Sequence, residues 1–309
     1  MSDYDHLPEG LEYHRPPQAA PDGEQYFPSE NLAAAVNVAL MLGRPILVTG
    51  DPGTGKTKLA KSIAADLGRK LFRFDTKSTS EARDLFYRYD AIGHFQAKTG
   101  AVTDYLEVNA LGEAILEASA DPDAAQLLGR APSGKPSVVL IDEIDKAPRD
   151  FPNDLLNELE SYTFRIKELR QKPFTLADSK LRPVIVITSN SEKNLPEAFV
   201  RRCAYHDIPF PDSAQLDDII AAQLPKLVAG DWQAHAVKFF LHLRAQRNLS
   251  RKPATAELLD WLYVLNRNKL TGLPWDVNKA KGTLGALLKG RDDRAAGEKA
   301  FTDWAKQPA

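Results

Sequence analysis

The stretch Gly50-Asp51-Pro52-Gly53-Thr54-Gly55-Lys56-Thr57 decides the fold of this 309-residue chain. It fits G-x-x-x-x-G-K-[ST], the pattern of a phosphate-binding loop. The glycines allow backbone N–H groups to turn inward around phosphate oxygens. Lys56 is then expected to place its ammonium on the β- and γ-phosphates, and the Thr57 hydroxyl to bind Mg²⁺.

The flanks of this loop agree with that interpretation. Residues 45–49 (PILVT) read as a buried strand, and residues 56–67 read as a helix that stops at Gly68. The positive end of that helix points at the bound phosphates. A Gly-rich turn that arises by chance is the alternative, and it explains neither flank.

The pattern beyond the loop indicates an α/β fold with a parallel sheet. Five short apolar runs, separated mostly by helical stretches, suit strands that are buried on both faces. They cover residues 45–49, 70–75, 137–142, 184–189 and 205–210. After Pro211 only helices are expected, over residues 214–224, 231–247, 255–267 and 277–289. We therefore expect an irregular arm over residues 1–27, a nucleotide-binding core over 28–212, and a helical domain with a C-terminal helix over 213–309.

Two acidic residues end the third apolar run. Asp142 is expected to bind Mg²⁺ through water, and Glu143 to act as the general base that polarises the attacking water. The carboxyl ends of parallel strands are where such sheets hold ligands. By themselves, these two residues read equally well as the cap of a following helix.

Polar residues later in the chain complete the candidate site. Asn190 directly follows the fourth run. If that strand lies between the other two motif strands, Asn190 can hydrogen-bond both the γ-phosphate and the attacking water, although an Asn at this position also suits a turn. Arg201 and Arg202 stand where an arginine finger would reach the γ-phosphate of a neighbouring subunit. Two arginines at a helix end also suit the helix dipole and solvent.

This set of motifs resembles the AAA+ superfamily and, within it, the MoxR-like ATPases. GDPGTGKT matches the Walker A motif, VVLIDEIDKA the Walker B motif and TSN the sensor 1 motif. LPEAFVRRC resembles the arginine-finger segment, in which Arg202 is the better match and Arg201 the alternative. The resemblance covers roughly residues 27–290.

The resemblance implies a P-loop core with five parallel strands in the order 5-1-4-3-2, followed by a smaller all-helical lid. It implies ATP and Mg²⁺ as ligands, ATP hydrolysis completed in trans, and a ring, commonly a hexamer. MoxR-like proteins are regarded as chaperone-like remodellers of a partner protein, often one with a von Willebrand factor A domain. The lid's sensor 2 is usually an arginine that opens a helix. This chain has Arg251-Lys252-Pro253 there, which makes Lys252 the candidate.

Two further segments have more than one interpretation. Residues 86–95 hold the densest aromatic stretch, which either faces a ring pore or packs on its own core. Residues 164–175 suit the hairpin that this branch inserts before sensor 1, and suit a plain hairpin or loop as well.

Composition narrows the classes of function. The formal net charge of -2 gives no global basic field, so we do not expect nucleic acid as a partner. The single cysteine excludes an internal disulfide framework, and we expect a cytoplasmic protein without a signal peptide or membrane span. An ATP-driven ring that remodels or activates a partner protein is the main hypothesis. A DNA-acting motor and a nucleotide-gated assembly switch are the alternatives.

Overall fold

The computed structural model describes residues 11–14, 26, 28–169, 172–190, 195–228 and 230–304. The chain divides into two compact units. One unit comprises Met1–Gly50 and Gly55–Ile208, and the other comprises Asp51–Thr54 and Pro209–Ala309. The arm expected over residues 1–27 lies mostly outside the described residues.

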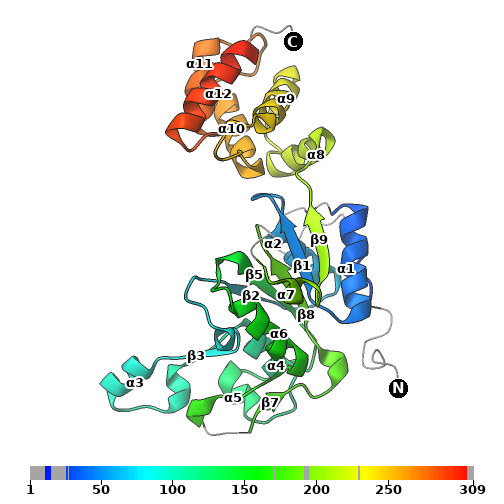
Figure 1. Cartoon of the computed structure of the whole chain (residues 1–309), viewed down its shortest axis with the longest axis vertical. Helices are drawn as coiled ribbons and strands as arrows, with labels where there is room; N and C mark the ends of the chain where they lie inside the picture. Colours follow the sequence, from blue (N-terminus) through cyan, green and yellow to red (C-terminus); the bar gives the residue numbers. More distant parts are fainter. Residues whose placement is uncertain are drawn as a thin grey trace. The chain divides into compact units, whose positions relative to one another are not determined.

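A five-stranded parallel sheet forms the centre of the first unit (Figure 1). Its strands, in spatial order, are β2 (Leu71–Asp75), β5 (Val138–Asp142), β8 (Val184–Thr188), β1 (Ile46–Gly50) and β9 (Ala204–Ile208). All neighbouring pairs are parallel. Counted over these five strands alone, the order is 5-1-4-3-2, so the expected P-loop α/β fold is confirmed.

Helices cover both faces of this sheet, which explains its near-continuous apolar strands. On β5, Val138 and Leu140 belong to the core shared with the helices α1 (Glu30–Leu42) and α2 (Lys56–Asp66). Val139 and Ile141 belong to the opposite core, shared with the helices α4 (Ala110–Glu117) and α6 (Phe151–Ser161). Ser29 accepts a hydrogen bond from the backbone N of Leu32 at 3.2 Å and caps the start of α1.

A small β–α–β segment follows β2 and contains the aromatic stretch. Its elements are η1 (Ala82–Leu85), β3 (Tyr87–Tyr89), α3 (Ala91–Ala97), η2 (Val102–Tyr105) and β4 (Leu106–Val108), with β3 and β4 antiparallel. Phe86 and Tyr87 are buried in the unit's own core, whereas Ile92 and Phe95 on α3 are 71% and 81% exposed. The stretch therefore divides into a core part and a solvent-exposed part.

Short elements complete the first unit. They are α5 (Ala124–Leu128), η3 (Ile144–Lys146), β6 (Thr163–Phe164), η4 (Lys167–Leu169), β7 (Phe174–Thr175), η5 (Ser179–Leu181) and α7 (Glu197–Val200). β6 and β7 pair antiparallel, so the segment expected over residues 164–175 forms a short hairpin that begins one residue earlier, at Thr163. Cys203 is buried, and burial raises the pKa of its thiol to about 12. It therefore stays a protonated, unreactive thiol at neutral pH.

The helical part of the second unit begins after β9. It consists of α8 (Ser213–Gln223), α9 (Asp231–Ala245), α10 (Thr255–Arg267), α11 (Val277–Gly282), η6 (Thr283–Gly285) and α12 (Arg291–Trp304). The single helix expected over residues 277–289 is wrong, because the α-helix ends at Gly282 and a 3₁₀ turn follows. The Thr283 hydroxyl accepts from the Trp261 indole at 2.8 Å and donates to the Ala280 carbonyl, which fixes this break.

No helix among the described residues is long and apolar enough to cross a membrane. The helices serve instead to bury apolar cores. In the second unit the core is rich in aromatic side chains, among them Trp232, Phe239, Phe240 and Trp261, each at most 1% exposed.

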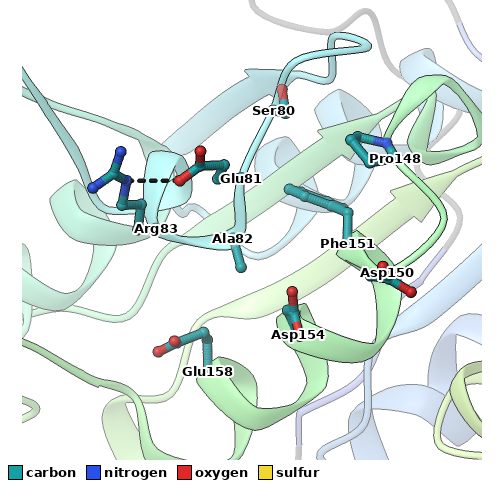
Figure 2. A pocket seen from close by; sticks show the side chains of 9 residues that line it. All are labelled: Ser80, Glu81, Ala82, Arg83, Pro148, Asp150, Phe151, Asp154 and Glu158. Carbon is teal, nitrogen blue, oxygen red and sulfur yellow. Dashed lines mark ion pairs between the residues drawn. The ribbon is translucent and has the colours of Figure 1, made fainter.

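An acidic pocket opens between the segment after β2 and the start of α6 (Figure 2). Its lining is Ser80, Glu81, Ala82, Arg83, Pro148, Asp150, Phe151, Asp154 and Glu158. Arg83 pairs with Glu81 at 2.9 Å. Burial, together with the negative charge of Asp154, raises the pKa of Glu158.

Glu117, at the end of α4, is a carboxylate only 1% exposed. Its oxygens accept from Lys70 Nζ at 3.1 Å, from the backbone N of Ser133 at 2.8 Å, and from Arg130. Burial raises the pKa of Glu117, but the hydrogen bonds from Arg130, Ser133 and Lys70 outweigh it and lower the pKa to about 2. Glu117 thus ties the chain around Ser133 to the sheet core.

Replacing Glu117 with Gln is expected to lower the free energy of unfolding by about 2 kcal/mol at pH 6. The folded pKa lies below the unfolded value of about 4.3. The contribution of the Glu117 carboxylate to the free energy of unfolding is therefore fully present above about pH 4.3, the unfolded-state pKa, and is lost as the pH falls towards 2. Urea unfolding of both proteins at pH 6 and pH 3 measures it, with the exposed Glu107→Gln as control. If the difference in the free energy of unfolding between wild type and Glu117→Gln is as large at pH 3 as at pH 6, the stabilising role of the ionised Glu117 is contradicted.

Candidate nucleotide site

The phosphate loop joins the end of β1 to the start of α2. Gly50, Gly53 and Gly55 have φ values of 141°, 81° and 90°, which side-chain-bearing residues rarely adopt. A Cβ built on Gly55 would lie 2.8 Å from the Tyr26 ring. Both backbone conformation and space therefore require glycine at this position.

Lys56 opens α2 and points back into its own loop. Its Nζ donates to the Gly50 carbonyl at 2.7 Å, and the residue is 7% exposed. The Thr54 hydroxyl donates to the Asp51 carbonyl at 2.9 Å. Two side chains of the motif therefore donate hydrogen bonds to backbone carbonyls of the same motif.

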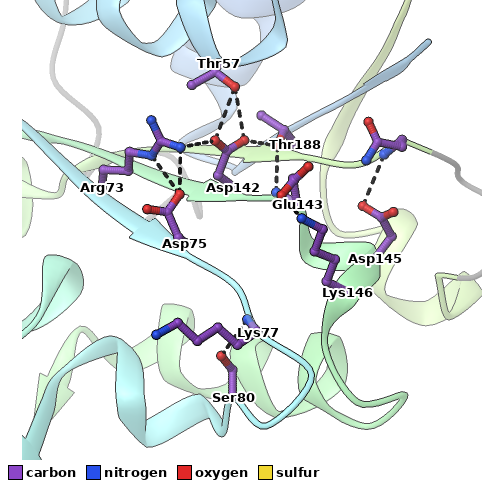
Figure 3. Close-up of polar contacts among 11 residues, drawn as sticks. Thr57, Arg73, Asp75, Lys77, Ser80, Asp142, Glu143, Asp145, Lys146 and Thr188 are labelled. Atoms are coloured by element: carbon purple, nitrogen blue, oxygen red, sulfur yellow. Dashed lines mark hydrogen bonds and ion pairs between the residues drawn. The ribbon is translucent and has the colours of Figure 1, made fainter. Parts of the chain in front are cut away.

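Asp142 gathers hydroxyl groups from two other elements (Figure 3). The Thr57 hydroxyl of α2 lies 3.2 Å from each carboxylate oxygen. The Thr188 hydroxyl of β8 donates to Oδ1 at 2.5 Å. A hydroxyl beside a buried carboxylate is an oxygen donor set that suits Mg²⁺, which keeps several of its waters in proteins. Among the described residues, no group of three or more His, Cys, Asp or Glu side chains forms a separate metal site.

Glu143 follows Asp142 and has a left-handed backbone conformation, with φ 57° and ψ 51°. Its backbone N donates to the Thr188 hydroxyl at 2.9 Å, and its side chain is 43% exposed. The carboxylate pairs with Lys146, and this hydrogen bond raises the pKa of Lys146. A non-glycine residue held in this region costs of order 1 kcal/mol, which is typical of functional positions.

The segment after β8 is attached to the segment after β5. The backbone N of Asn190 donates to Asp145 Oδ1 at 3.1 Å. Asn190 lies just beyond β8, the strand that carries Thr188. Because β8 and β5 are parallel, Asn190 is at the same carboxyl end of the sheet as Asp142. Residues 191–194, which include the turn considered for this Asn, lie outside the described residues.

Arg201 and Arg202 follow α7, and both are exposed. Arg201 pairs with Glu197 one turn earlier. The backbone N of Arg202 donates to the Phe199 carbonyl at 3.0 Å, so its position is fixed by the end of the helix. The structure does not bring either arginine into the cluster around Asp142 within one chain.

The middle of the phosphate loop, Asp51–Thr54, belongs to the second unit, together with the helices after β9. Within that unit, Arg244 Nη2 donates to Asp51 Oδ2 at 2.6 Å, and the guanidinium lies 3.3 Å from the centre of the Phe210 ring. A Cβ on Gly53 would lie 2.8 Å from the Cβ of Ala254. Lys252, the sensor 2 candidate, is exposed two residues before Ala254.

Sequence reasoning missed several charged contacts at the site. Arg73 of β2, Lys146 of η3 and Arg244 of α9 each contact a residue of the predicted motifs, and Asp75 of β2 pairs with Arg73. One signal was available for β2, since apolar and charged residue types alternate over residues 72–75 (FRFD). In that pattern, the two charged residues share one face of a strand at the sheet edge.

The sequence profile described as "ATPase family associated with various cellular activities (AAA)" matches residues 46–211, more than half of the chain. Lon protease from Mycolicibacterium smegmatis is 29% identical over 186 residues, which cover 58% of this chain and 20% of that protein. Lon protease 2 from Bdellovibrio bacteriovorus is 31% identical over 174 residues, which cover 53% and 18%. The chain thus spans about a fifth of the length of these curated relatives.

Two solved structures match the chain with TM-scores below 0.5. A mutant of Thermotoga maritima RuvB has a TM-score of 0.49 at 17% identity, covering 91% of this chain and 76% of that one. The AAA domain of FIGL-1 in complex with ADP has a TM-score of 0.42 at 17% identity, covering 85% and 77%. At these values we draw no functional inference from either likeness.

Proposed function

Because the chain belongs to the ATPase family associated with various cellular activities (AAA), we propose that it binds ATP with Mg²⁺ in the phosphate loop and hydrolyses it. One observation carries this proposal: Thr57 after the loop and Asp142 at the end of β5 lie 3.2 Å apart at the same sheet edge. Motifs that are 85 residues apart in sequence therefore form one polar site.

In this proposal the loop residues Gly50–Thr57 cradle the phosphates through their backbone N–H groups. Lys56 exchanges its contact with the Gly50 carbonyl for the phosphate oxygens. Thr57 would hold Mg²⁺ directly and Asp142 through water. When bound, the ion offsets the charge that develops on the phosphates.

Glu143 is the proposed general base. Its carboxylate is partly exposed, and its backbone is fixed by Thr188, the same residue that holds Asp142. An exposed ion pair such as that with Lys146 contributes little, so the carboxylate can leave Lys146 to accept a proton from water. Asn190 would orient that water from the neighbouring strand.

We further propose that neighbouring copies complete the site in a ring, commonly a hexamer in proteins of this type. The exposed position of Arg202 after α7 supports a role as arginine finger in trans, with Arg201 as the alternative. A role in remodelling a protein partner, as in MoxR-like ATPases, is supported by the β3–α3–β4 segment. This segment presents the apolar side chains of Ile92 and Phe95 to solvent.

ATP turnover per protomer, measured across a wide range of protein concentration, tests the proposal. A rate that rises with concentration supports catalysis shared between subunits. A rate that does not depend on concentration contradicts the ring. A parallel titration with DNA distinguishes the motor alternative, because only that alternative predicts stimulation by DNA.

A further inference from the structure

Two carboxylates stand side by side on neighbouring strands at the candidate metal site. In the parallel pairing of β2 and β5, Asp75 is in register with Asp142. Two carboxylates on adjacent strands at this separation repel each other. This pair therefore needs a cation close by.

Arg73 supplies that cation. Its Nη2 lies 2.7 Å from Asp75 Oδ1 and 3.0 Å from Asp142 Oδ2, and its Nε donates to Asp75 Oδ1 at 2.8 Å (Figure 3). The alternation of β2 brings this about, because Phe72 and Phe74 are buried and Arg73 and Asp75 share the other face. One guanidinium thus bridges two carboxylates.

The contact reaches the proposed metal ligand itself. Asp142 Oδ1 accepts from Thr188, and its Oδ2 is shared between the Thr57 hydroxyl and Arg73. A cation on Oδ2 reduces the negative potential that Asp142 offers to Mg²⁺, and Asp75 in turn weakens the hold of Arg73.

We propose that Arg73 is a positioning residue that competes with Mg²⁺ for Asp142, with Asp75 opposing it, and so sets the Mg²⁺ concentration at which the protein holds metal-bound nucleotide. This inference rests on the proposed function. The charges of the three side chains sum to −1, since two carboxylates face one guanidinium. The sum becomes −2 in Arg73→Gln, 0 in Asp75→Asn and −1 in the double variant.

The Mg²⁺ midpoint is the free Mg²⁺ concentration at which nucleotide binding is half-maximal. We expect it to fall as the summed charge of the three side chains becomes more negative. One elementary charge a few ångströms from a divalent ion changes its binding on the order of tenfold in a partly hydrated site. Arg73→Gln should therefore lower the midpoint about tenfold, and Asp75→Asn should raise it. The double variant should return to within about threefold of wild type, since its summed charge of −1 equals that of wild type.

The test uses the full chain and a fluorescent ATP analogue. Binding is first measured in EDTA and then during a titration with free Mg²⁺, so the readout is nucleotide binding and not turnover. Opposite shifts in the two single variants support the inference. An unchanged or raised midpoint in Arg73→Gln, or shifts of both single variants in the same direction, would overturn it.

Two other outcomes of this experiment also have a defined meaning. If Arg73→Gln does not fold, as judged by its thermal unfolding, Asp75→Asn alone decides, and an unchanged or lowered midpoint overturns the inference. If wild type binds no nucleotide at any Mg²⁺ concentration, the proposed function itself fails, and this inference fails with it.

Discussion

Replacing Glu143 with Gln is expected to lower kcat for ATP hydrolysis by about 10²- to 10⁴-fold, the usual contribution of a general base. The amide has nearly the same shape as the carboxylate but cannot take a proton from water. Binding of ATP should remain within a few-fold of wild type, because the phosphate loop, Thr57 and Asp142 are unchanged. Steady-state turnover and equilibrium binding of a fluorescent ATP analogue measure the two quantities separately.

The control for this variant is Glu107→Gln, which makes the same chemical change on the exposed face of β4. It should leave both turnover and binding unchanged. A Glu143→Gln protein that still hydrolyses ATP at more than a tenth of the wild-type rate would exclude Glu143 as the general base. Loss of binding together with turnover would instead assign Glu143 to the structure of the site.

Replacing Arg202 with Ala should lower turnover by about 10³-fold, the smaller end of the range for an arginine finger. The residue is exposed and lies outside the Asp142 cluster, so a single folded chain should retain its stability and its affinity for ATP. Turnover at a protein concentration where the wild-type rate is maximal, together with thermal unfolding, gives the comparison.

Arg201→Ala and Arg267→Ala serve as comparisons for Arg202→Ala. Arg201 is adjacent and pairs with Glu197. If Arg201→Ala lowers turnover more than Arg202→Ala does, Arg201 and not Arg202 is the arginine finger. Arg267, exposed at the end of α10, should have no effect. Equal turnover in wild type and in both of the adjacent variants would contradict a finger in this segment.

The sheet could be predicted from sequence because its signals are local. Each apolar run is short, and four of the five end at a polar residue, as residues 137–142 do at Asp142. The glycines of the phosphate loop show that the run before them is β1. The strand order itself followed from the resemblance, not from the apolar pattern. The break after α11 was missed, since it depends on the contact between Thr283 and Trp261, 22 residues apart.

The charged contacts around the site could not be predicted in the same way. Arg73 meets Asp142 only because β2 and β5 are neighbours in register, across 69 residues of chain. Arg244 meets Asp51 across 193 residues. Local spacing in the sequence does not show which of these distant residues come into contact. The residues of a contiguous motif, in contrast, can be identified from the motif alone. The roles of the motif residues stay predictions until the variants are measured.

Mixing Glu143→Gln with Arg202→Ala tests most directly whether hydrolysis takes place at a site shared by two copies. In a randomly mixed ring, a site is complete when an Arg202→Ala chain supplies Glu143 and its neighbour, a Glu143→Gln chain, supplies Arg202. Statistics then predict turnover of about a quarter of the wild-type rate from an equimolar mixture of two nearly inactive proteins. A mixture that stays as inactive as its components would contradict a finger contributed in trans.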